Sequence, residues 1–546
     1  MELDLTLQRV KSAQQLVGHY AAEIMAFKQG HLTPYNFPDS FSLKRDTPIQ
    51  FESVPILFDT SVATALEAIK THVQKPGTGP YYRVPPLAIT SMARSGKTTL
   101  LQTIFNKLLE EGQFNPILVD FNGGGEFSLQ DGESDYDGFL RWVATSLLYD
   151  DPKTAPRRIC RQQELEEYLS DSPKPIVLMV DELNALTGNN PSQDLAKLLR
   201  QMFLDQSDRY LCFTSHWFMN LEQVVGRARE GIPSPRATEF VHVPRTLNPK
   251  QINKVLPSAN TTAVQLAACL GSVGLIFSKH KEGYEPSVRF KKRMQARELY
   301  PVESFLVEFC SGDEEHRDMR DFDEYTTRLD SGKIAWPLCF AKPFLLKAGE
   351  YQLHALIEHT EHSIGLQTFD SGLEWEFTAR VAVAIVARSS MFRDLTRIEA
   401  QVIGVPEDCR PEKFRIVTLP EKIQDVESAQ KHLRDVMEKD RAARQLVVAY
   451  PSHTNFNIFD TITCFKASEV SSIKFTGQQM KQRDNVPGQD APFDGVLLRG
   501  DGPEKQTGAL TRQNWRYLGH EQIKEFLPYS LQPLIPSAWL KEKRRR

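Results

Sequence analysis

Short apolar runs alternate with longer amphipathic stretches between residues 81 and 250. Apolar spacing typical of helices follows in Thr98–Glu111 and Gln193–Phe203. Strands that alternate with helices in this way form parallel sheets covered by helices on both faces. The pattern therefore predicts an α/β domain at 81–250. Its expected strands are Leu87–Thr90, Pro116–Asp120, Ile176–Val180 and Tyr210–Thr214.

The pattern differs on either side of this core. Residues 1–80 predict an accessory segment with helices in Leu3–Phe27 and Ser61–Val73, and residues 251–360 predict a helical extension. From 361 to 546 an amphipathic helix, Leu373–Arg388, precedes a second series of strands and the basic tail KEKRRR. A separate α/β domain is expected there. Its expected strands are Phe414–Thr418, Gln445–Ala449, Ile458–Phe465, Ile473–Phe475 and Gly495–Leu498.

Composition narrows the class of protein. A chain of 546 residues with 40% hydrophobic residues is too long for one core, so several globular domains are expected. The net charge of −4 argues against a protein that coats nucleic acid over its whole surface. The seven scattered cysteines form no CxxC pair, which predicts reduced thiols and no zinc site. We expect a soluble protein without a signal peptide, membrane span or membrane partner.

A phosphate-binding loop is predicted where the first strand meets the first helix, in the segment PPLAITSMARSGKTTLL. Backbone N–H groups at the helix N-terminus would face the phosphates, Lys97 would add a positive charge, and the Thr98 hydroxyl would bind Mg²⁺. Ser91 stands where such loops usually have their first glycine, so a positive φ would be costly there. The predicted nucleotide-binding residues are Ser91, Arg94, Ser95, Gly96, Lys97, Thr98, Thr99 and Asp181.

Two acids follow the most apolar strand, in PIVLMVDEL. At the end of a strand beside the phosphates, Asp181 would hold Mg²⁺ together with Thr98. Glu182 would act as the general base that activates the attacking water. The spacing of these acids from Lys97 leaves room for one further strand and helix.

Other polar residues near this core have two readings. Thr214, Ser215 and His216 end the strand YLCFTSHW, either as sensors of the γ-phosphate or as ordinary hydrogen-bonding caps of the strand. Arg227 and Arg229 are candidate arginine fingers, although surface arginines are common. Glu126, in the glycine-rich stretch after the second strand, could face the site, although a plain tight loop is the simpler interpretation.

A second, looser constellation lies in the C-terminal region. Asp460 falls within the predicted strand FNIFDTITCF, and Gln479 and Lys481 end the next strand, on one face because side chains alternate. Asp460, Gln479 and Glu376 could hold a metal ion, with Lys481 orienting the attacking water, as in Mg²⁺-dependent nucleases. An ordinary half-buried hairpin is the alternative.

The chain resembles the Crinkler and retrotransposon-hot-spot (RHS) group, in which a P-loop NTPase is joined to a restriction-endonuclease-like, PD-(D/E)xK domain. The resemblance covers residues 80–500 and is carried by ARSGKTTLL, ILVDFNGGGEF, IVLMVDELNAL and FTSHW, followed by LEWEF, FDTITCF and GQQMK. It implies an NTPase that uses Lys97, Thr98, Asp181 and Glu182. It also implies a DNA-acting domain with Asp460, Gln479 and Lys481. No LFLAK-type translocation motif is present in residues 1–80.

These observations lead to one main hypothesis. ATP or GTP hydrolysis with Mg²⁺ would control a C-terminal nuclease-like domain that acts on DNA, in the nucleus or cytoplasm of its own cell or of a host cell. Any homo-oligomer would form through contacts between NTPase domains. The alternative is a nucleotide-driven switch whose C-terminal domain only binds nucleic acid or protein. A small-molecule kinase is less compatible with the helical region after residue 250.

Overall fold

The computed structural model describes residues 34–51, 58–74, 85–121, 133–149, 158–183, 193–215, 227–229, 232–233, 238–243, 301–313, 325–328, 333–365, 371–439, 442–452, 459–468, 472–481, 494–499, 515–518 and 520–534, with a few positions between 269 and 290. The chain divides into two compact units. Unit 1 contains Met1–Ser91 and Gly96–Pro244, and unit 2 contains Met92–Ser95 and Arg245–Arg546. The expected helix Leu3–Phe27 lies outside the described residues.

Unit 1 is built on a five-stranded sheet with the order β2-β3-β4-β1-β7, in which every neighbouring pair is parallel. The parallel sheet predicted from the alternation of strands and helices is therefore confirmed. In this order β4 separates β1 from β3, so elements far apart in the sequence share one sheet edge. The strands are β1 (Leu87–Thr90), β2 (Asn115–Asp120), β3 (Ile176–Asp181), β4 (Arg209–Ser215) and β7 (Glu239–His242).

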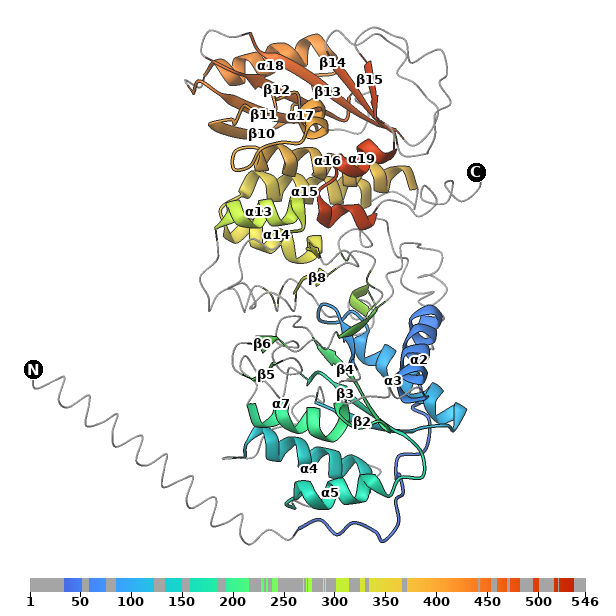
Figure 1. The fold of residues 1–546 in the computed structure, drawn as a ribbon. Helices are drawn as coiled ribbons and strands as arrows, with labels where there is room; N and C mark the ends of the chain where they lie inside the picture. Colours follow the sequence, from blue (N-terminus) through green and yellow to red (C-terminus); the bar gives the residue numbers. More distant parts are fainter. Residues whose placement is uncertain are drawn as a thin grey trace, which may run out of the picture. The chain divides into compact units, whose positions relative to one another are not determined.

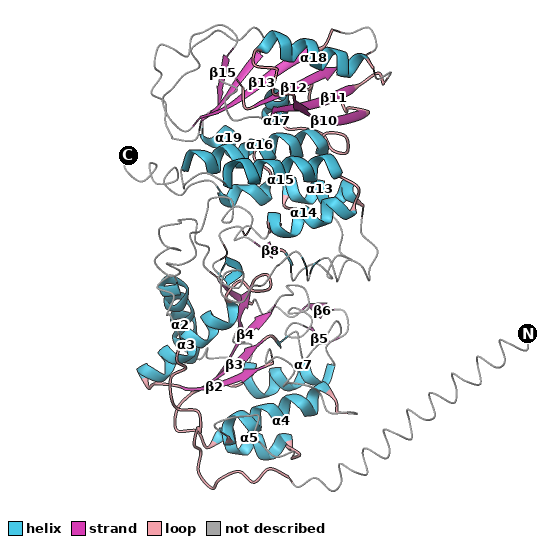
Figure 2. Ribbon diagram, turned by 180° about the vertical axis from the view of Figure 1, so that it is seen from behind, coloured by secondary structure: helices cyan, strands magenta, loops and turns pink. Residues whose placement is uncertain are grey.

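Helices cover both faces of this sheet (Figures 1 and 2). Along β3, Ile176, Leu178 and Val180 belong to the core under one set of helices, while Val177 and Met179 belong to the core under the other. This alternation places apolar side chains on both faces, as a doubly covered strand requires. The first set is α4 (Asp135–Leu148), α5 (Gln162–Ser170) and α7 (Gln193–Leu199), and the second is α2 (Asp59–Gln74) and α3 (Lys97–Glu111).

The predicted helix Gln193–Phe203 is only partly α-helical. After α7 the backbone continues as a π-helix, η3 (Arg200–Leu204), before β4 begins. The wider turn still buries its apolar residues Met202, Phe203 and Leu204 against the sheet. The sequence pattern therefore located the buried stripe correctly, since burial depends on apolar spacing more than on the type of helix.

Unit 2 contains a six-stranded sheet in which spatial order follows chain order, β10 to β15. The pairs β11–β12 and β12–β13 are antiparallel, and the other neighbouring pairs are parallel. Strand β15 was not predicted. The strands are β10 (Lys413–Leu419), β11 (Gln445–Pro451), β12 (Thr461–Lys466), β13 (Lys474–Lys481), β14 (Asp494–Arg499) and β15 (Trp515–Leu518).

Helices lie on both sides of this sheet too (Figures 1 and 2). Helix α18 (Val426–Glu438) packs on the face that includes Val447 and Ala449, and the larger helical cluster packs on the face that includes Leu446 and Val448. The cluster contains α13 (Val302–Ser311), α14 (Leu338–Lys347), α15 (Tyr351–Gly365), α16 (Ser371–Ser389), α17 (Arg397–Ile403), α19 (His520–Phe526) and the 3₁₀ helix η6 (Tyr529–Leu534). The short strand pairs are β5 (Arg227–Arg229) with β6 (Ile232–Pro233), and β8 (Thr327–Arg328) with β9 (Ile334–Ala335).

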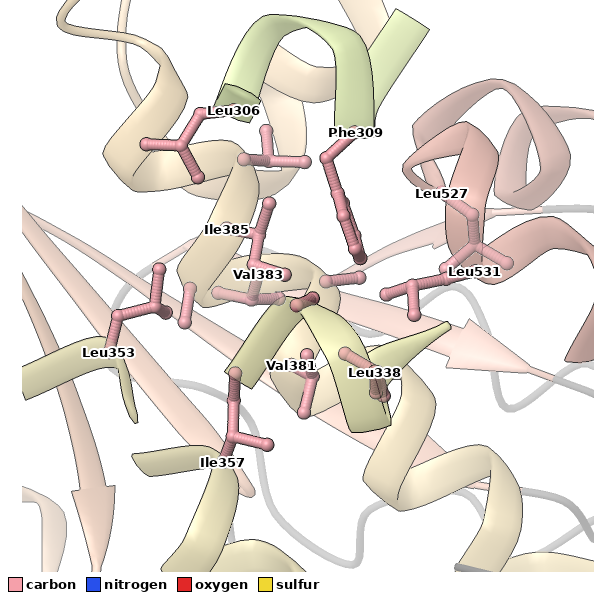
Figure 3. Close-up of a cluster of buried hydrophobic side chains, with 14 of the residues drawn as sticks. Leu306, Phe309, Leu338, Leu353, Ile357, Val381, Val383, Ile385, Leu527 and Leu531 are labelled. Atoms are coloured by element: carbon pink, nitrogen blue, oxygen red, sulfur yellow. The ribbon is translucent and has the colours of Figure 1, made fainter. Parts of the chain in front are cut away.

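Helix α16 is the centre of the helical cluster, and its predicted amphipathic character is wrong. From 377 to 387 each residue is buried. Figure 3 shows Val381, Val383 and Ile385 enclosed by side chains from several other elements, among them Leu306, Leu353 and Leu527. A helix that is covered on all sides carries apolar residues around its whole circumference.

None of the helices in the described ranges combines the length and the apolar character that a membrane-spanning helix needs.

Candidate functional site

The loop between β1 and α3 has the backbone conformation that the phosphate-loop prediction needs, although at different positions. Gly96 is the N-cap of α3 with φ 104° and ψ 15°. Arg94, an exposed residue, also has a positive φ of 60°. Ser91 is not among the described non-glycine residues with positive φ. The strain expected at Ser91 therefore falls at Arg94, while Gly96 adopts its left-handed conformation without a Cβ to oppose it.

Helix α3 begins at the end of this loop, at Lys97. Its N-cap, Gly96, has no side chain with which to cap the helix, and the first intrahelical bond runs from the Leu100 N–H to the Gly96 carbonyl, at 2.9 Å. The backbone N–H groups of the first turn point along the helix axis and carry partial positive charge. An anion is the natural ligand of such an end.

The acid at the end of β3 is bound to the first turn of α3. The Thr98 hydroxyl donates to Oδ2 of Asp181 at 2.7 Å. Asp181 is 1% exposed and Thr98 is half-buried, so this bond is partly shielded from solvent. The two residues that were predicted to share a magnesium ion therefore already share a hydrogen bond.

The second acid faces the loop lysine. Nζ of Lys97 lies 3.6 Å from Oε1 of Glu182, and the two side chains are 3% and 7% exposed. Two opposite charges at this depth compensate each other's loss of water. Lys97 and Glu182, which are 85 positions apart in the chain, thus meet at the carboxyl edge of the sheet.

Burial also changes the acid–base behaviour of Asp181. Loss of water around the carboxylate raises its pKa to about 6, and the neighbouring Glu182 carboxylate adds to this effect. The hydrogen bonds from Thr214 and Thr98 act in the opposite direction, because they stabilise the ionised form. Burial therefore makes the ionised form of this carboxylate less favourable than it is in water, a situation common at functional sites.

Thr214, near the end of β4, contacts both acids. Its hydroxyl donates to Oδ1 of Asp181 at 2.6 Å, and the Glu182 N–H donates to the same hydroxyl oxygen at 2.7 Å. Glu182 has a positive φ of 55°, which is unusual for a residue with a side chain. This role of Thr214 was missed, because hydrogen-bond partners on another strand leave no trace in the local sequence.

The oxygen donors fit a magnesium ion, and the helix end fits a phosphate. Mg²⁺ prefers hard oxygen ligands such as a carboxylate and a hydroxyl, and Asp181 and Thr98 bring these groups within hydrogen-bond distance of each other. Gly96 has no Cβ, and one built there would lie 3.4 Å from Cζ of Phe58. Among the described residues no group of three or more His, Cys, Asp or Glu side chains has the geometry of a metal site. A magnesium ion here would therefore need Thr98 and water as further ligands.

Several other candidates lie outside the described residues. His216 and Glu126 belong to segments that the structure does not describe, and of Arg227 and Arg229 only the backbone of β5 is described. Ser215 and Thr99 are described, the first buried and the second half-buried in the first turn of α3. Ser95 is buried, next to Gly96.

In unit 2, the prediction that Asp460 lies within a strand is wrong, because β12 begins one residue later, at Thr461. Even so, the Asp460 N–H donates to the carbonyl of Gln478 on β13 at 2.9 Å. Asp460 is thereby held beside β13, which contains Gln479 and Lys481. The side chains of Gln479, Lys481 and Glu376 lie outside the described residues, so the structure neither brings this constellation together nor separates it.

The neighbouring position on β13 is occupied by a structural residue. The side chain of Gln478 is fully buried and donates to the Val402 carbonyl and to the Thr463 hydroxyl, at 2.7 and 2.8 Å. It joins β13 to α17 and β12. Gln478 therefore anchors the strand beside Asp460.

No protein-family model matches the sequence, and neither does any curated protein. Among solved structures, the chain is similar to a Walker-type ATPase of Pyrococcus abyssi, with 11% identity, a TM-score of 0.31 and coverage of 53% of this chain and 95% of that one. It is also similar to the ORC2 protein of Aeropyrum pernix, solved in ADPNP–ADP complexes, with 14% identity, a TM-score of 0.29 and coverage of 62% and 84%. The ORC1 protein of Aeropyrum pernix, solved with DNA, has 13% identity, a TM-score of 0.28 and coverage of 66% and 92%.

These TM-scores are too low for the similarities to support an argument about this chain. We therefore describe its fold from its own structure. Unit 1 has a parallel five-stranded sheet, Gly96 at the N-terminus of α3, and the acids Asp181 and Glu182 at the end of β3. This architecture is consistent with a P-loop NTPase core.

Proposed function

We propose that unit 1 binds a nucleoside triphosphate, ATP or GTP, with Mg²⁺ and hydrolyses it. The observation that carries the proposal is the convergence of four side chains from two distant segments: Thr98 on Asp181 at 2.7 Å, and Lys97 on Glu182 at 3.6 Å. A chance match to the loop motif would not bring two buried acids to the same helix end.

Binding would use the positive groups of the loop. The N-terminal turn of α3 would receive the phosphates on its backbone N–H groups, with Gly96 allowing close approach. The Lys97 ammonium would shift from Glu182 toward the β- and γ-phosphate oxygens. Thr98 and Asp181 would hold Mg²⁺, which supplies charge neutralisation on the phosphates when bound.

Hydrolysis would use Glu182 as the general base. Its carboxylate accepts a proton from a water molecule, whose oxygen attacks the γ-phosphorus while the bond to the bridging oxygen breaks. The products are the nucleoside diphosphate and inorganic phosphate. Once Lys97 binds phosphate, the Glu182 carboxylate loses its counter-charge and becomes a better base.

The test compares Lys97→Ala with Lys107→Ala in the full-length protein. Lys107 lies on the same helix, pairs with Glu110 at 2.6 Å and is exposed, so it is a matched control. We expect Lys97→Ala to abolish ATP and GTP turnover and Lys107→Ala to retain it, with both variants folded by circular dichroism. Turnover that persists in Lys97→Ala would remove this site from the reaction.

A second proposal concerns unit 2, where nucleotide state would control a nuclease-like domain acting on DNA. The hydrogen bond from the Asp460 N–H to the Gln478 carbonyl supports it, because it holds Asp460 beside the strand that carries Gln479 and Lys481. A nucleotide-driven switch with a non-catalytic binding domain is the competing proposal. Hydrolysis is measured with and without duplex DNA: stimulation supports a domain that acts on or binds DNA, whereas no response contradicts the nuclease version and leaves a switch whose domain binds protein.

A further inference from the structure

We propose that Thr214 is a positioning residue for hydrolysis, which holds the Asp181 carboxylate and the Glu182 backbone in their working arrangement and does not contact the γ-phosphate. The inference rests on the proposed function of the same site. It is carried by the two hydrogen bonds of the Thr214 hydroxyl and by the positive φ of Glu182.

The direction of the hydrogen bonds follows from the number of protons. The Glu182 N–H can only donate, so the Thr214 oxygen accepts at 2.7 Å. An ionised carboxylate can only accept, so the single proton of the Thr214 hydroxyl goes to Oδ1 of Asp181, at 2.6 Å. The hydroxyl then has no proton left for a phosphate oxygen. A sensor that donates to the γ-phosphate would first have to break its bond to Asp181.

Both oxygens of Asp181 are fixed in this way. Oδ1 accepts from Thr214 and Oδ2 accepts from Thr98, at 2.7 Å, so hydroxyl groups from two elements clamp the carboxylate plane. The Thr98 hydroxyl donates its only hydrogen bond to Asp181, so its oxygen lone pairs point away from that carboxylate. This is the orientation that a hydroxyl needs in order to bind a cation.

The backbone of Glu182 depends on the same hydroxyl. A φ of 55° is unfavourable for a residue with a Cβ and persists only where surrounding contacts hold it. The bond from its N–H to Thr214, which is fully buried, provides such a contact. Because the side chain direction follows from φ, Thr214 indirectly aims the Glu182 carboxylate toward Lys97.

The test uses Thr214→Val, which keeps the shape and removes the hydroxyl, and Thr214→Ser, which restores it. The matched control is Thr145→Val, which removes a buried hydroxyl that bonds the Tyr35 hydroxyl at 2.7 Å, away from the acids. The measurements are kcat for ATP hydrolysis and the dissociation constant of a non-hydrolysable ATP analogue, in the full-length protein. Wild type and Lys97→Ala are run alongside.

We expect Thr214→Val to lower kcat by about 10- to 100-fold. Losses of this size are typical for residues that orient a metal-binding side chain without touching the substrate. Analogue affinity should fall much less than kcat, because Lys97 and the first turn of α3 still hold the phosphates, and Thr214→Ser and Thr145→Val should hydrolyse as wild type does. Wild-type kcat in Thr214→Val would overturn the proposal. So would a loss of analogue affinity as large as the loss of kcat, because that result indicates direct contact with the nucleotide. A Thr214→Ser variant as slow as Thr214→Val would overturn it too.

Failure of the proposed function has a different signature. If wild type shows no turnover above Lys97→Ala, unit 1 is not a hydrolase at this site and the role of Thr214 falls with it. If that difference is present and Thr214→Val is fast, only the positioning role falls. Should Thr214→Val not fold, Thr214→Cys replaces it, because the thiol fills the space but is a weak donor; wild-type kcat there would overturn the proposal.

Discussion

The Nζ atom of Lys97 lies 3.6 Å from Oε1 of Glu182, and both side chains are almost completely buried. Each charge therefore compensates the other at close range. A triphosphate at the end of α3 would compete with Glu182 for Lys97, so binding of the anion and release of the base are linked. The predictions below test this arrangement and its surroundings.

Glu182→Gln should separate binding from hydrolysis. The amide keeps the size of the side chain and cannot take a proton from water, so we expect kcat to fall by about 10²- to 10⁴-fold. Nucleotide affinity should be retained or improved, because Lys97 no longer has to give up an ion pair with residue 182 in order to bind the phosphates. Turnover and equilibrium binding are measured on the same preparation.

The control is Glu110→Gln, which removes an exposed acid at the far end of the same helix. It should leave both quantities as in wild type. Normal turnover in Glu182→Gln would exclude Glu182 as the base.

The raised pKa of Asp181 predicts that this residue stabilises the folded protein more in acid than near neutral pH. Because the folded-state pKa of about 6 lies above the ordinary aspartate pKa of 3.8, the favourable contribution is complete below pH 3.8 and is lost as the pH rises to about 6. Relative to Asp181→Asn, the wild type should therefore lose about 3 kcal/mol of unfolding free energy across this window. Denaturant unfolding in metal-free buffer at several pH values gives the difference.

Asp171→Asn, at an exposed acid after α5, is the control and should follow the wild-type curve. A constant difference between wild type and Asp181→Asn at every pH would contradict the assignment of the shift to Asp181.

Gly96→Ala adds a single methyl group, yet it should clearly lower the affinity for nucleotide. At φ 104° a Cβ is strained, and it would also lie 3.4 Å from the Phe58 ring. If the variant loop leaves this conformation and must recover about 1 to 2 kcal/mol of strain in order to bind, affinity should fall by about 5- to 30-fold. Binding of a fluorescent nucleotide analogue measures this loss.

Gly112→Ala is the matched change, at the other end of α3. Its φ of 65° is also left-handed, yet nothing lies within 4 Å of the added Cβ. It should reduce stability by about 1 kcal/mol and leave affinity unchanged. Equal affinity losses in the two variants would indicate a general effect on α3 instead of a local effect at the loop.

Asp460→Ala tests the nuclease hypothesis in unit 2. It should abolish Mg²⁺-dependent cleavage of duplex DNA and leave nucleotide hydrolysis intact, since Lys97 and the acids of unit 1 are untouched. Asp435→Ala, at an exposed acid of α18, is the control. Cleavage that survives in Asp460→Ala would place any nuclease centre elsewhere, and cleavage absent from wild type would favour the switch.

Local sequence was sufficient to predict a structural feature wherever all the residues that define the feature lie in one segment. The apolar run Ile176–Val180 predicted a doubly covered strand because a strand with helices on both faces needs apolar residues in succession. Gly96, Lys97 and Thr98 are consecutive, so their spacing alone indicated a helix that begins in a phosphate-type loop. The same reasoning failed for α16, whose circumference is buried by elements that the helix sequence does not contain.

Tertiary structure alone decided how these segments meet. The placement of β4 between β1 and β3 brings Thr214 onto Asp181 and Glu182, and no spacing rule connects residues 32 and 33 positions apart on separate strands. The left-handed conformations of Arg94 and Glu182 were equally invisible, because local preference disfavours them and only surrounding contacts hold them. The sequence by itself indicated the candidate residues Lys97, Thr98, Asp181 and Glu182 and the approximate positions of most strands and helices. Which side chains share a proton or a charge depended on packing between distant segments, because hydrogen bonds and ion pairs depend on distance in space.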